Sequence, residues 1–325
     1  MVREVRTLNI LVTGGLGFIG SNFIRHMLEK YNDYRVINLD KQTYAGNPEN
    51  LKDIENNLNY SFVRGDICDP AIVDKVMQKA DQVVHFAAES HVDRSIEDAS
   101  AFVRTNVLGT FTLLESARKY KVSRFIHIST DEVYGSRERG SFKEKDRLTP
   151  SSPYSSSKAG SDLLAQSYYI THKLPVIITR CTNNFGPYQY PEKLMPLFIT
   201  NLLENKKVPV YGTGKNVRDW IYVPDHCKAV DFVLHNGIPG EIYNIGGGAE
   251  RSNIEITKKI IEILGADESM IEYVEDRKGH DFRYSLNCTK LHKLGWAPEH
   301  GFNEALESTV RWYAQNQWWW KKLKR

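Results

Sequence analysis

The sequence has few cysteines, and they lie far apart. Four thiols are spread over 325 residues, and no two have the spacing of a zinc site. They are too few to staple a chain of this length, so a small secreted protein held together by disulfide bonds is excluded. We expect reduced thiols, no bound metal and a cytoplasmic protein.

Long apolar runs and an excess of one charge are also absent. The cleanest apolar run, residues 83–88, already contains His85, whereas a membrane span needs roughly 18 or more apolar residues. The 43 lysine and arginine residues nearly balance the 40 aspartate and glutamate residues. Proteins whose main partner is nucleic acid or an anionic membrane carry a large excess of positive charge instead. We therefore expect neither of these partners.

The first 180 residues alternate β-branched runs with longer helical patterns, which is typical of βαβ units. The runs predict strands near residues 9–13, 35–39, 60–63, 82–86, 124–129 and 176–179. The patterns between them predict helices near residues 20–30, 70–79, 100–120 and 154–172. Right-handed crossovers then predict an α/β fold with a Rossmann-type, doubly wound parallel sheet and a ligand crevice at the carboxyl ends of its strands.

The sequence pattern changes after Cys181. Loop-forming residues become frequent there, and the alternation of predicted strands and helices becomes irregular. We predict a sheet domain at residues 1–182 with a returning segment at about 220–250, in which residues 221–223 and 241–245 resemble strands. A smaller, discontinuous C-terminal domain that covers the substrate would take most of residues 183–325. The chain ends in three tryptophans and a basic tail, which favours a last helix packing its aromatics on the body over a membrane anchor.

A glycine-rich turn joins the first predicted strand to the first predicted helix. Gly14, Gly17 and Gly20 lie where a pyrophosphate must approach the amides of a helix N-terminus, and a Cβ would be in its way. Asp40 ends the second predicted strand, where a carboxylate accepts hydrogen bonds from an adenosine ribose diol. The combination predicts NAD as the cofactor. Lys41 leaves NADP open, because a basic residue there partly accommodates a 2′-phosphate.

Two further segments end strands at the same crevice. Asp66 follows the third strand, where it can reach the adenine or cap the helix that begins near Pro70. Small residues within the segment 86–90 follow the fourth strand and let a dinucleotide lie close.

Tyr154 and Lys158 lie four residues apart, hence on one face of a predicted helix. A lysine cation and a positive nicotinamide ring lower the pKa of a tyrosine, so we expect Tyr154 to act as a phenolate base toward an alcohol. Thr130, at the carboxyl end of the fifth strand, can hydrogen-bond the same hydroxyl. Asp131 and Glu132 follow it, and two carboxylates are more than an oxidation needs. Their alternative interpretation is a helix N-cap with solvated charges.

These residues lie in motifs that the chain shares with a known family. Nearly the whole chain resembles the extended short-chain dehydrogenase/reductases, in their NAD-dependent sugar-nucleotide branch, and within it the 4,6-dehydratases. The motifs that carry the resemblance are residues 13–20, 40–47, 87–95, 129–135, 152–158, 183–188, 191–194, 218–220 and 276–280. The triplet at residues 130–132 is the most specific, because related epimerases and decarboxylases place other residues at the two acidic positions.

The resemblance implies that dTDP-glucose is converted to its 4-keto-6-deoxy derivative and water. Tyr154 would take the proton of the C4 hydroxyl while the C4 hydride passes to NAD⁺. Glu132 would act as the base at C5 and Asp131 as the acid that lets the C6 hydroxyl leave. Hydride would then return to C6, so the cofactor ends as it began. The implied catalytic residues are Thr130, Asp131, Glu132, Tyr154 and Lys158.

Further residues are expected around the two ligands. On the substrate side, Arg218 is the expected contact with the strongest physical reason, because a planar guanidinium fits phosphate oxygens. The alternative role of Arg218 is an ion pair with Asp219 or Asp225. The expected cofactor-binding residues are Gly14, Gly17, Phe18, Ile19, Gly20, Asp40, Lys41, Thr43, Gly46, Asp66, Ile67, Phe86, Ala87, Ala88, Ser90, Thr105, Tyr154, Lys158 and Asn184. The expected substrate-binding residues are Ser90, Thr130, Asn183, Lys193, Leu194, Pro209, Tyr211, Arg218, Asn253, Arg277 and His280.

Other interpretations stay open at this point. A 4-epimerase or decarboxylase of the same fold would share NAD, Tyr154 and Lys158, although neither explains two acids after Thr130. A non-catalytic NAD-binding scaffold could lose all of these side chains without penalty. The resemblance also implies a homodimer through the helices near residues 100–120 and 154–172.

Overall fold

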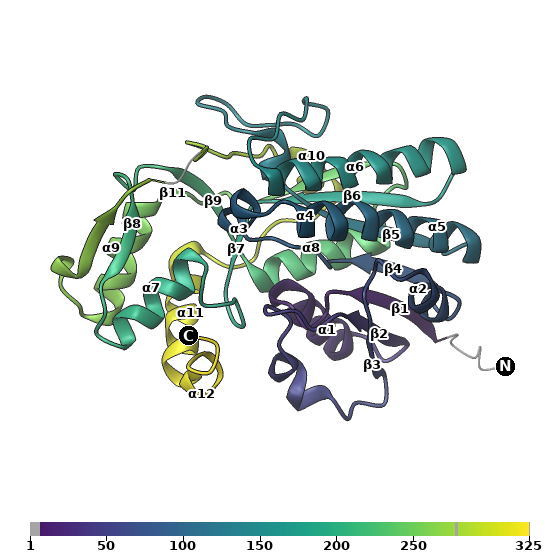
Figure 1. Cartoon of the computed structure of the whole chain (residues 1–325), viewed down its shortest axis with the longest axis horizontal. Coiled ribbons are helices and arrows are strands. Elements are labelled where there is room, and N and C mark those ends of the chain that lie inside the picture. The colour runs from purple at the N-terminus through teal and green to yellow at the C-terminus, as the bar shows by residue number, and fades with distance from the viewer. Residues whose placement is uncertain (1–6, 277–278, 325) are drawn as a thin grey trace.

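A seven-stranded sheet forms the larger body of the protein (Figure 1), in a computed structural model that describes residues 7–276 and 279–324. Every neighbouring pair in this sheet is parallel, in the order β10-β6-β5-β4-β1-β2-β3. The strands are β1 (Leu8–Thr13), β2 (Tyr34–Asp40), β3 (Tyr60–Arg64), β4 (Gln82–His85), β5 (Arg124–Thr130), β6 (Val176–Cys181) and β10 (Ile242–Ile245). The strand order reverses at β1, so the loops after β1 and β4 diverge and leave a crevice. The predicted fold class is confirmed, and the strands predicted in the first 180 residues lie within two residues of their expected bounds.

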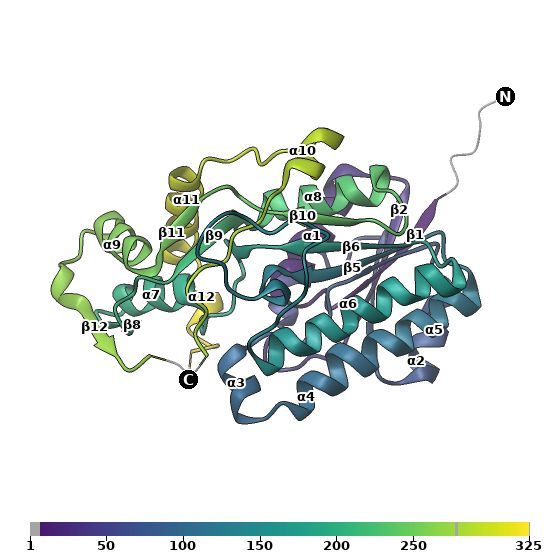
Figure 2. The ribbon, with the colours of Figure 1, turned by 90° about the horizontal axis from the view of Figure 1, so that it is seen from above.

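Helices cover both faces of this sheet (Figure 2). One layer consists of α2 (Pro70–Met77), α3 (Val92–Glu97), α4 (Ser100–Phe102), α5 (Thr110–Tyr120) and α6 (Pro153–His172), and the other of α1 (Phe18–Lys30), α8 (Val223–Asn236) and α10 (Thr289–Leu294). Alternating side chains of the strands separate two cores. Ile10 and Val12 pack in the core of α1 and α8, whereas Leu11 packs in the core of α2 and α5. The carboxyl ends of the strands point toward the smaller lobe (Figure 1).

The helix predicted at residues 100–120 is not continuous. A π-helical segment, η2 (Val103–Gly109), separates α4 from α5. Its Asn106 is buried and donates hydrogen bonds to the Glu89 carbonyl at 3.0 Å and to Ser157 Oγ at 2.8 Å, while accepting one from the Glu89 amide at 2.9 Å. Such widened turns are frequent at functional sites. This one ties the loop after β4 to α6.

Within the residues that the structure describes, the smaller lobe carries two short sheets and four helices around a core of its own, and its strands join in the orders β11-β9-β7 and β12-β8. Its elements are β7 (Asn183–Phe185), α7 (Leu194–Leu203), β8 (Val208–Tyr211), β9 (Val217–Tyr222), β11 (Glu250–Ser252), α9 (Asn253–Leu264), β12 (Ile271–Val274), α11 (Phe302–Gln315) and α12 (Gln317–Trp320). Short helical turns complete the description as η1 (Pro48–Ile54), η3 (Asp131–Tyr134) and η4 (Glu268–Met270).

One strand predicted for the returning segment lies elsewhere. Ile221 pairs with Asn184 of β7, so residues 221–222 end β9 in the three-stranded sheet instead of rejoining the large one, and Val223 begins α8. Pro224 at the start of that helix accounts for the early end of the strand, because proline suits the first turn of a helix and donates no ladder hydrogen bond. The second predicted strand does join the large sheet, as β10 beside β6. The division into two domains stays a prediction.

The C-terminal tryptophans pack on the body, as predicted for an aromatic last helix. Trp319 and Trp320 are fully buried, whereas Trp318 is half exposed. Trp319 Nε1 donates to Asn50 Oδ1 at 2.8 Å, and Asn50 Nδ2 donates to the Leu16 carbonyl at 2.9 Å. The smaller lobe thus braces the glycine-rich turn of the larger body. Of the helices in the described residues, none has both the length and the apolar character needed to cross a bilayer.

Candidate active site

A cavity of about 320 Å³ lies at the carboxyl edge of the large sheet, between the sheet and the smaller lobe. Residues that follow β1, β2, β3, β4, β5 and β6 all contribute to its wall. Every residue expected around the cofactor lines it, as do the five expected catalytic residues. A wider hollow of about 1140 Å³ lies at the opposite edge, among the first residues of β1, β2 and β3, away from these side chains.

The glycine-rich turn forms one wall of this cavity. Gly14 has a φ of +72°, and a Cβ on it would lie 2.6 Å from the Ala87 amide nitrogen. A Cβ on Gly20 would lie 2.3 Å from the Gly14 carbonyl oxygen. Gly17 caps α1 without a side-chain hydrogen bond, so the amides of the first turn face the cavity as an anion site. The turn therefore fits a pyrophosphate, as the sequence predicts.

Asp40 and Lys41 end β2 at the same wall. Burial raises the pKa of the Asp40 carboxyl, although amide donors from Gln42 at 2.8 Å and Leu16 at 3.0 Å oppose the rise. Lys41 Nζ lies 2.8 Å from Asp66 Oδ2, so its charge is already matched by a carboxylate. This pairing weakens the reason for expecting a 2′-phosphate there.

Asp66 does not cap the helix after it. Its Oδ1 accepts a hydrogen bond from the Cys68 amide at 2.9 Å, and the side chain that caps α2 is Asp69. The alternative interpretation of Asp66 as the N-cap of α2 is therefore wrong, and the cap lies three residues later. An N-cap side chain must reach the second or third amide of the helix, which Asp69 does. Its predicted contact with an adenine stays a prediction.

The acidic pair begins the turn η3 directly after β5. Thr130 Oγ1 donates to Asp131 Oδ1 at 3.1 Å and accepts from the Glu132 amide at 3.3 Å. Burial, then the charge of Glu132, raises the pKa of Asp131 well above its ordinary value, which favours the protonated form of this carboxyl. Its Oδ2 is buried and has no hydrogen-bond partner in the part of the chain that the structure describes. The interpretation of both residues as solvated capping charges does not fit Asp131, which is 2% exposed.

Tyr154 and Lys158 face this turn from α6. The helix begins at a capping box on Ser152 with Pro153 in its first turn. Both functional side chains are buried, and Lys158 Nζ donates to the Ile128 carbonyl at 2.7 Å. Burial lowers the pKa of Lys158 to about 8.

Burial has the largest effect on the pKa of Tyr154, and the sequence-based expectation did not include it. Burial, followed by the charge of Glu132, raises this pKa well above the ordinary value, while a hydrogen bond with Thr130 opposes the rise. The pattern of two residues on one helix face could not show this, because it carries no information on burial. The phenolate therefore needs more positive charge than Lys158 provides.

The expected substrate residues divide into two groups. Ser90, Thr130, Asn183 and Lys193 line the cavity, and Lys193 Nζ donates to the Ser90 carbonyl at 2.9 Å. The others belong to the smaller lobe and do not line the cavity, namely Leu194, Pro209, Tyr211, Arg218, Asn253 and His280. Arg277 lies outside the described residues.

Arg218 is buried and well ordered by main-chain carbonyls. Its Nη1 donates to Val217 at 2.7 Å and its Nη2 to Asp281 at 2.8 Å, while its guanidinium lies 4.2 Å from the centre of the Tyr284 ring. Its charge also lowers the pKa of Asp131, which places it within electrostatic reach of the acidic pair. Asp225, one of the two ion-pair partners considered for Arg218, instead pairs with His300 at 2.7 Å.

The cavity wall also contains residues that the sequence did not single out. Glu89, Thr182, Cys181, Gln189, Tyr190 and Glu192 line it. Glu192 accepts hydrogen bonds from Tyr44 at 2.9 Å and from Arg94 at 3.1 Å, which joins the lobe to the loop after β2. These contacts join segments about 100 residues or more apart, so no local pattern could have predicted them.

Fold and site together define an NAD-type dinucleotide-binding enzyme of the extended short-chain dehydrogenase/reductase class, with two carboxyl side chains added beside the tyrosine and lysine. The chain belongs to the GDP-mannose 4,6 dehydratase family, whose profile matches residues 11–309.

Individual relatives agree with this membership over nearly the whole chain. A dTDP-glucose 4,6-dehydratase of Streptomyces niveus is 52% identical, covering 98% of this chain and 96% of the relative. A low-salt glycan biosynthesis protein of Haloferax volcanii is 54% identical, covering 94% of this chain and 98% of the relative. The solved dTDP-glucose 4,6-dehydratase of Streptomyces venezuelae, with NAD and TYD bound, is 52% identical with a TM-score of 0.96, covering 98% of this chain and all of that one.

Proposed function

We propose that this protein is a dTDP-glucose 4,6-dehydratase, which uses NAD to convert dTDP-glucose to dTDP-4-keto-6-deoxyglucose and water. The observation that carries the proposal is the buried Asp131 next to Glu132, both of which act electrostatically on Tyr154 in a glycine-lined cavity. A 4-epimerase needs only the tyrosine and lysine. The similarity to dehydratases at 52% identity supports the same conclusion.

The residues around the glycine-rich turn fit NAD. The amides at the start of α1 would hold its pyrophosphate, and Asp40 would accept hydrogen bonds from the adenosine ribose. Phe86, Ala87 and Ala88 leave room for the dinucleotide at the end of β4. When bound, NAD supplies the oxidant that takes hydrogen with its electron pair from C4 and gives it back at C6.

The chain's own groups move the protons. Tyr154 takes the proton of the C4 hydroxyl, and the positive charge that its phenolate needs comes from Lys158 together with the oxidised nicotinamide. The resulting ketone acidifies the C5 hydrogen, which Glu132 removes. Asp131 gives its proton to the C6 hydroxyl, which leaves as water, and Glu132 later returns its proton to C5. Burial raises the pKa of Asp131, which favours the protonated form that its role as the acid requires.

Incubation of the purified protein with dTDP-glucose tests this function. We expect a product with the alkali-induced absorbance of a 4-keto sugar and a mass lower by one water. Absence of that product from NAD-loaded protein would contradict the proposal, and a 4-epimer would identify the alternative.

Gly20→Ala is expected to weaken NAD binding. The new Cβ would meet the Gly14 carbonyl at 2.3 Å and the Gly15 Cα at 2.9 Å, and neither backbone atom can turn aside. Overpacking of about 1–3 kcal/mol corresponds to about a ten- to hundredfold loss of affinity, measurable by calorimetric titration. Gly301→Ala is the matched control, because nothing lies within 4 Å of its Cβ and its φ is −66°. An unchanged NAD affinity in Gly20→Ala would show that the turn does not seat the pyrophosphate.

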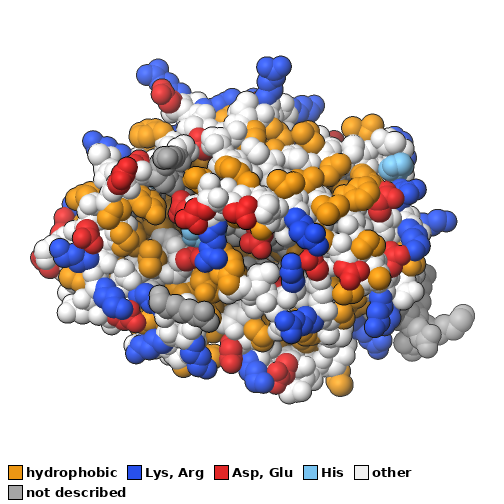
Figure 3. Space-filling view, in the orientation of Figure 1, with side chains coloured by type: hydrophobic (Ala, Val, Ile, Leu, Met, Phe, Trp, Pro, Cys, Tyr) orange, Lys and Arg blue, Asp and Glu red, His pale blue; other side chains and the backbone are white. Residues whose placement is uncertain are grey.

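We also propose a homodimer formed through α5 and α6. Figure 3 shows apolar side chains gathered over the face where these helices lie in Figure 1. Leu163 and Ile170 on α6 are 56% and 66% exposed and lie seven residues apart, hence on one face. Phe111 adds a third exposed apolar side chain from α5.

The four free thiols suit the cytoplasm, where we expect the enzyme to work.

Leu163→Glu is expected to convert the dimer to a monomer in sedimentation experiments, because it places a charge in the apolar contact. Ile238→Glu changes a similarly exposed residue in the loop before β10 and is expected to leave the dimer intact. A Leu163→Glu protein that sediments like the wild type would refute this interface.

A further inference from the structure

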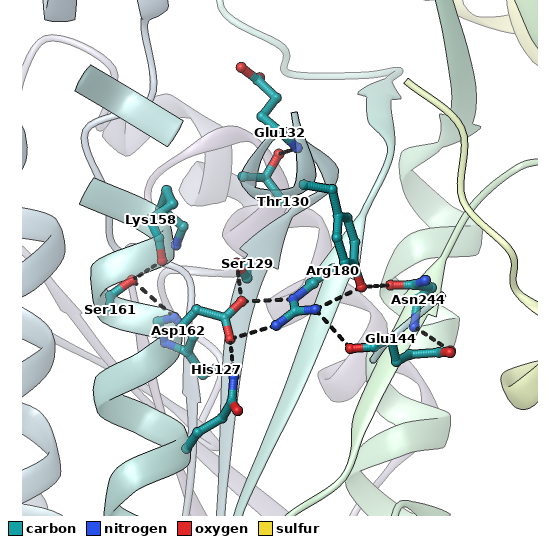
Figure 4. A network of polar contacts seen from close by, with 12 residues as sticks. His127, Ser129, Thr130, Glu132, Glu144, Lys158, Ser161, Asp162, Arg180 and Asn244 are labelled. Atoms are coloured by element: carbon teal, nitrogen blue, oxygen red, sulfur yellow. Dashed lines mark hydrogen bonds and ion pairs between the residues drawn. The ribbon is translucent and has the colours of Figure 1, made fainter. Parts of the chain in front are cut away.

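Asp162 and Arg180 form a buried ion pair beside the active site (Figure 4). Arg180 Nε and Nη2 donate to the two carboxylate oxygens of Asp162 at 2.8 and 3.0 Å, and both residues are almost fully buried. Ser129 and Gln166 complete the hydrogen bonding of the carboxylate, at 3.1 and 3.0 Å. A buried pair of this kind adds little net stability relative to apolar residues of similar volume, so stability alone does not explain it.

The pair contacts both ends of the segment that presents the acidic residues. Ser129, before the triplet, donates to Asp162 Oδ2. Tyr134, the last residue of η3, accepts a hydrogen bond from Arg180 Nη1 at 2.7 Å. The Tyr134 hydroxyl in turn donates to Asn244 Oδ1 of β10 at 2.9 Å. The residues between these two anchors are the expected threonine, acid and base.

One member of the pair, Asp162, lies on the helix that carries the redox residues. Asp162 lies one turn after Lys158 and two turns after Tyr154 on α6. Figure 4 shows Lys158 and Asp162 on this helix, with Arg180 reaching across from the neighbouring strand. The groups that face the Lys158 ammonium include Asp162 of its own helix, Cys181 of β6 and the neutral His85 and His127 of β4 and β5.

We propose that Asp162 and Arg180 are positioning residues that hold the elimination acid and base in place relative to the tyrosine that oxidises C4. The pair clamps the segment 129–134 at both ends and fixes it to α6. Tyr154 and Lys158 keep their places through the helix and its capping box. Asp131 and Glu132 depend on the clamp. Loosening it should therefore slow the loss of water more than the oxidation. The inference rests on the proposed function.

Tyr134→Phe tests this proposal with the smallest change. It removes the hydroxyl between Arg180 and Asn244, while Arg180 keeps Asp162 and the Glu144 carbonyl at 3.1 Å, so no charge is left unpaired. A shift of the turn by about 1 Å costs up to about a hundredfold in rate. We expect the elimination to slow about tenfold or more, with accumulation of reduced cofactor during single turnover. The rate of C4 oxidation and the KM for dTDP-glucose should stay at the wild-type values.

Tyr243→Phe is the matched control. This tyrosine is equally buried on β10, and its hydroxyl accepts from the Ile238 amide at 3.1 Å, away from the clamp. Arg180→Lys provides a second test, because one ammonium can keep its charge against Asp162 but lacks the planar fork that also reaches Tyr134. It should show the same separation of steps.

The outcomes are distinguishable. Wild-type protein without dehydratase activity would overturn the proposed function and this inference with it. Active wild-type protein, together with a Tyr134→Phe variant whose oxidation and elimination fall equally or not at all, would overturn the inference alone. A slowed elimination at unchanged oxidation supports it.

Discussion

Glu132→Gln is expected to stop the reaction after C4 oxidation. The amide has nearly the shape of the carboxylate but cannot remove the proton from C5, so the ketone forms and water stays on C6. Loss of a general base costs roughly 10²–10⁴-fold in rate. Rapid mixing with dTDP-glucose should therefore show cofactor reduction at the wild-type rate, followed by accumulation of the reduced form in place of product.

Glu268→Gln is the matched control for this variant. Glu268 pairs with Lys258 at the surface of the smaller lobe, at 2.8 Å, and such exposed pairs contribute little. It should turn over like the wild type. Product formation by Glu132→Gln at the wild-type rate would assign the C5 base to another residue.

Tyr154→Phe is expected to abolish both cofactor reduction and product formation. Without the hydroxyl, no group takes the C4 proton, and every later step depends on the ketone. The expected loss is again roughly 10²–10⁴-fold, but now it affects the first step. Because the side chain is 8% exposed and keeps its ring, the fold should tolerate the change.

Comparing the two variants separates oxidation from elimination. Tyr243→Phe, which removes a buried hydroxyl away from the site, should retain both activities. Cofactor reduction by Tyr154→Phe at the wild-type rate would contradict its role as the base for C4 oxidation.

Local patterns predicted the parts of the fold and site that local chemistry determines. The glycine-rich turn, the strand end at Thr130 and the helix with Tyr154 and Lys158 each need only a few neighbouring residues. The π-helical segment escaped prediction because a short stretch of widened turns barely alters the apolar period of a helix. The place of β9 in the three-stranded sheet depended on pairing with β7, which is more than 30 residues away in sequence.

The features of the site that the sequence could not predict depend on burial and on contacts between distant segments. The raised pKa of Tyr154 follows from a cavity assembled by several strands. Asp162 and Arg180 come from a helix and a strand whose side chains meet only in the folded sheet. The low accessibility of Asp131 likewise separates a buried carboxyl from a solvated capping residue.

The most direct measurement uses dTDP-glucose that carries deuterium at C4. If one site oxidises, dehydrates and reduces the same molecule, the deuterium must leave C4 and reappear at C6. We predict a 4-keto-6-deoxy product with deuterium in its C6 methyl group, seen by NMR and mass spectrometry. Deuterium retained at C4 of a sugar that has lost no water would contradict this reaction and indicate epimerisation instead.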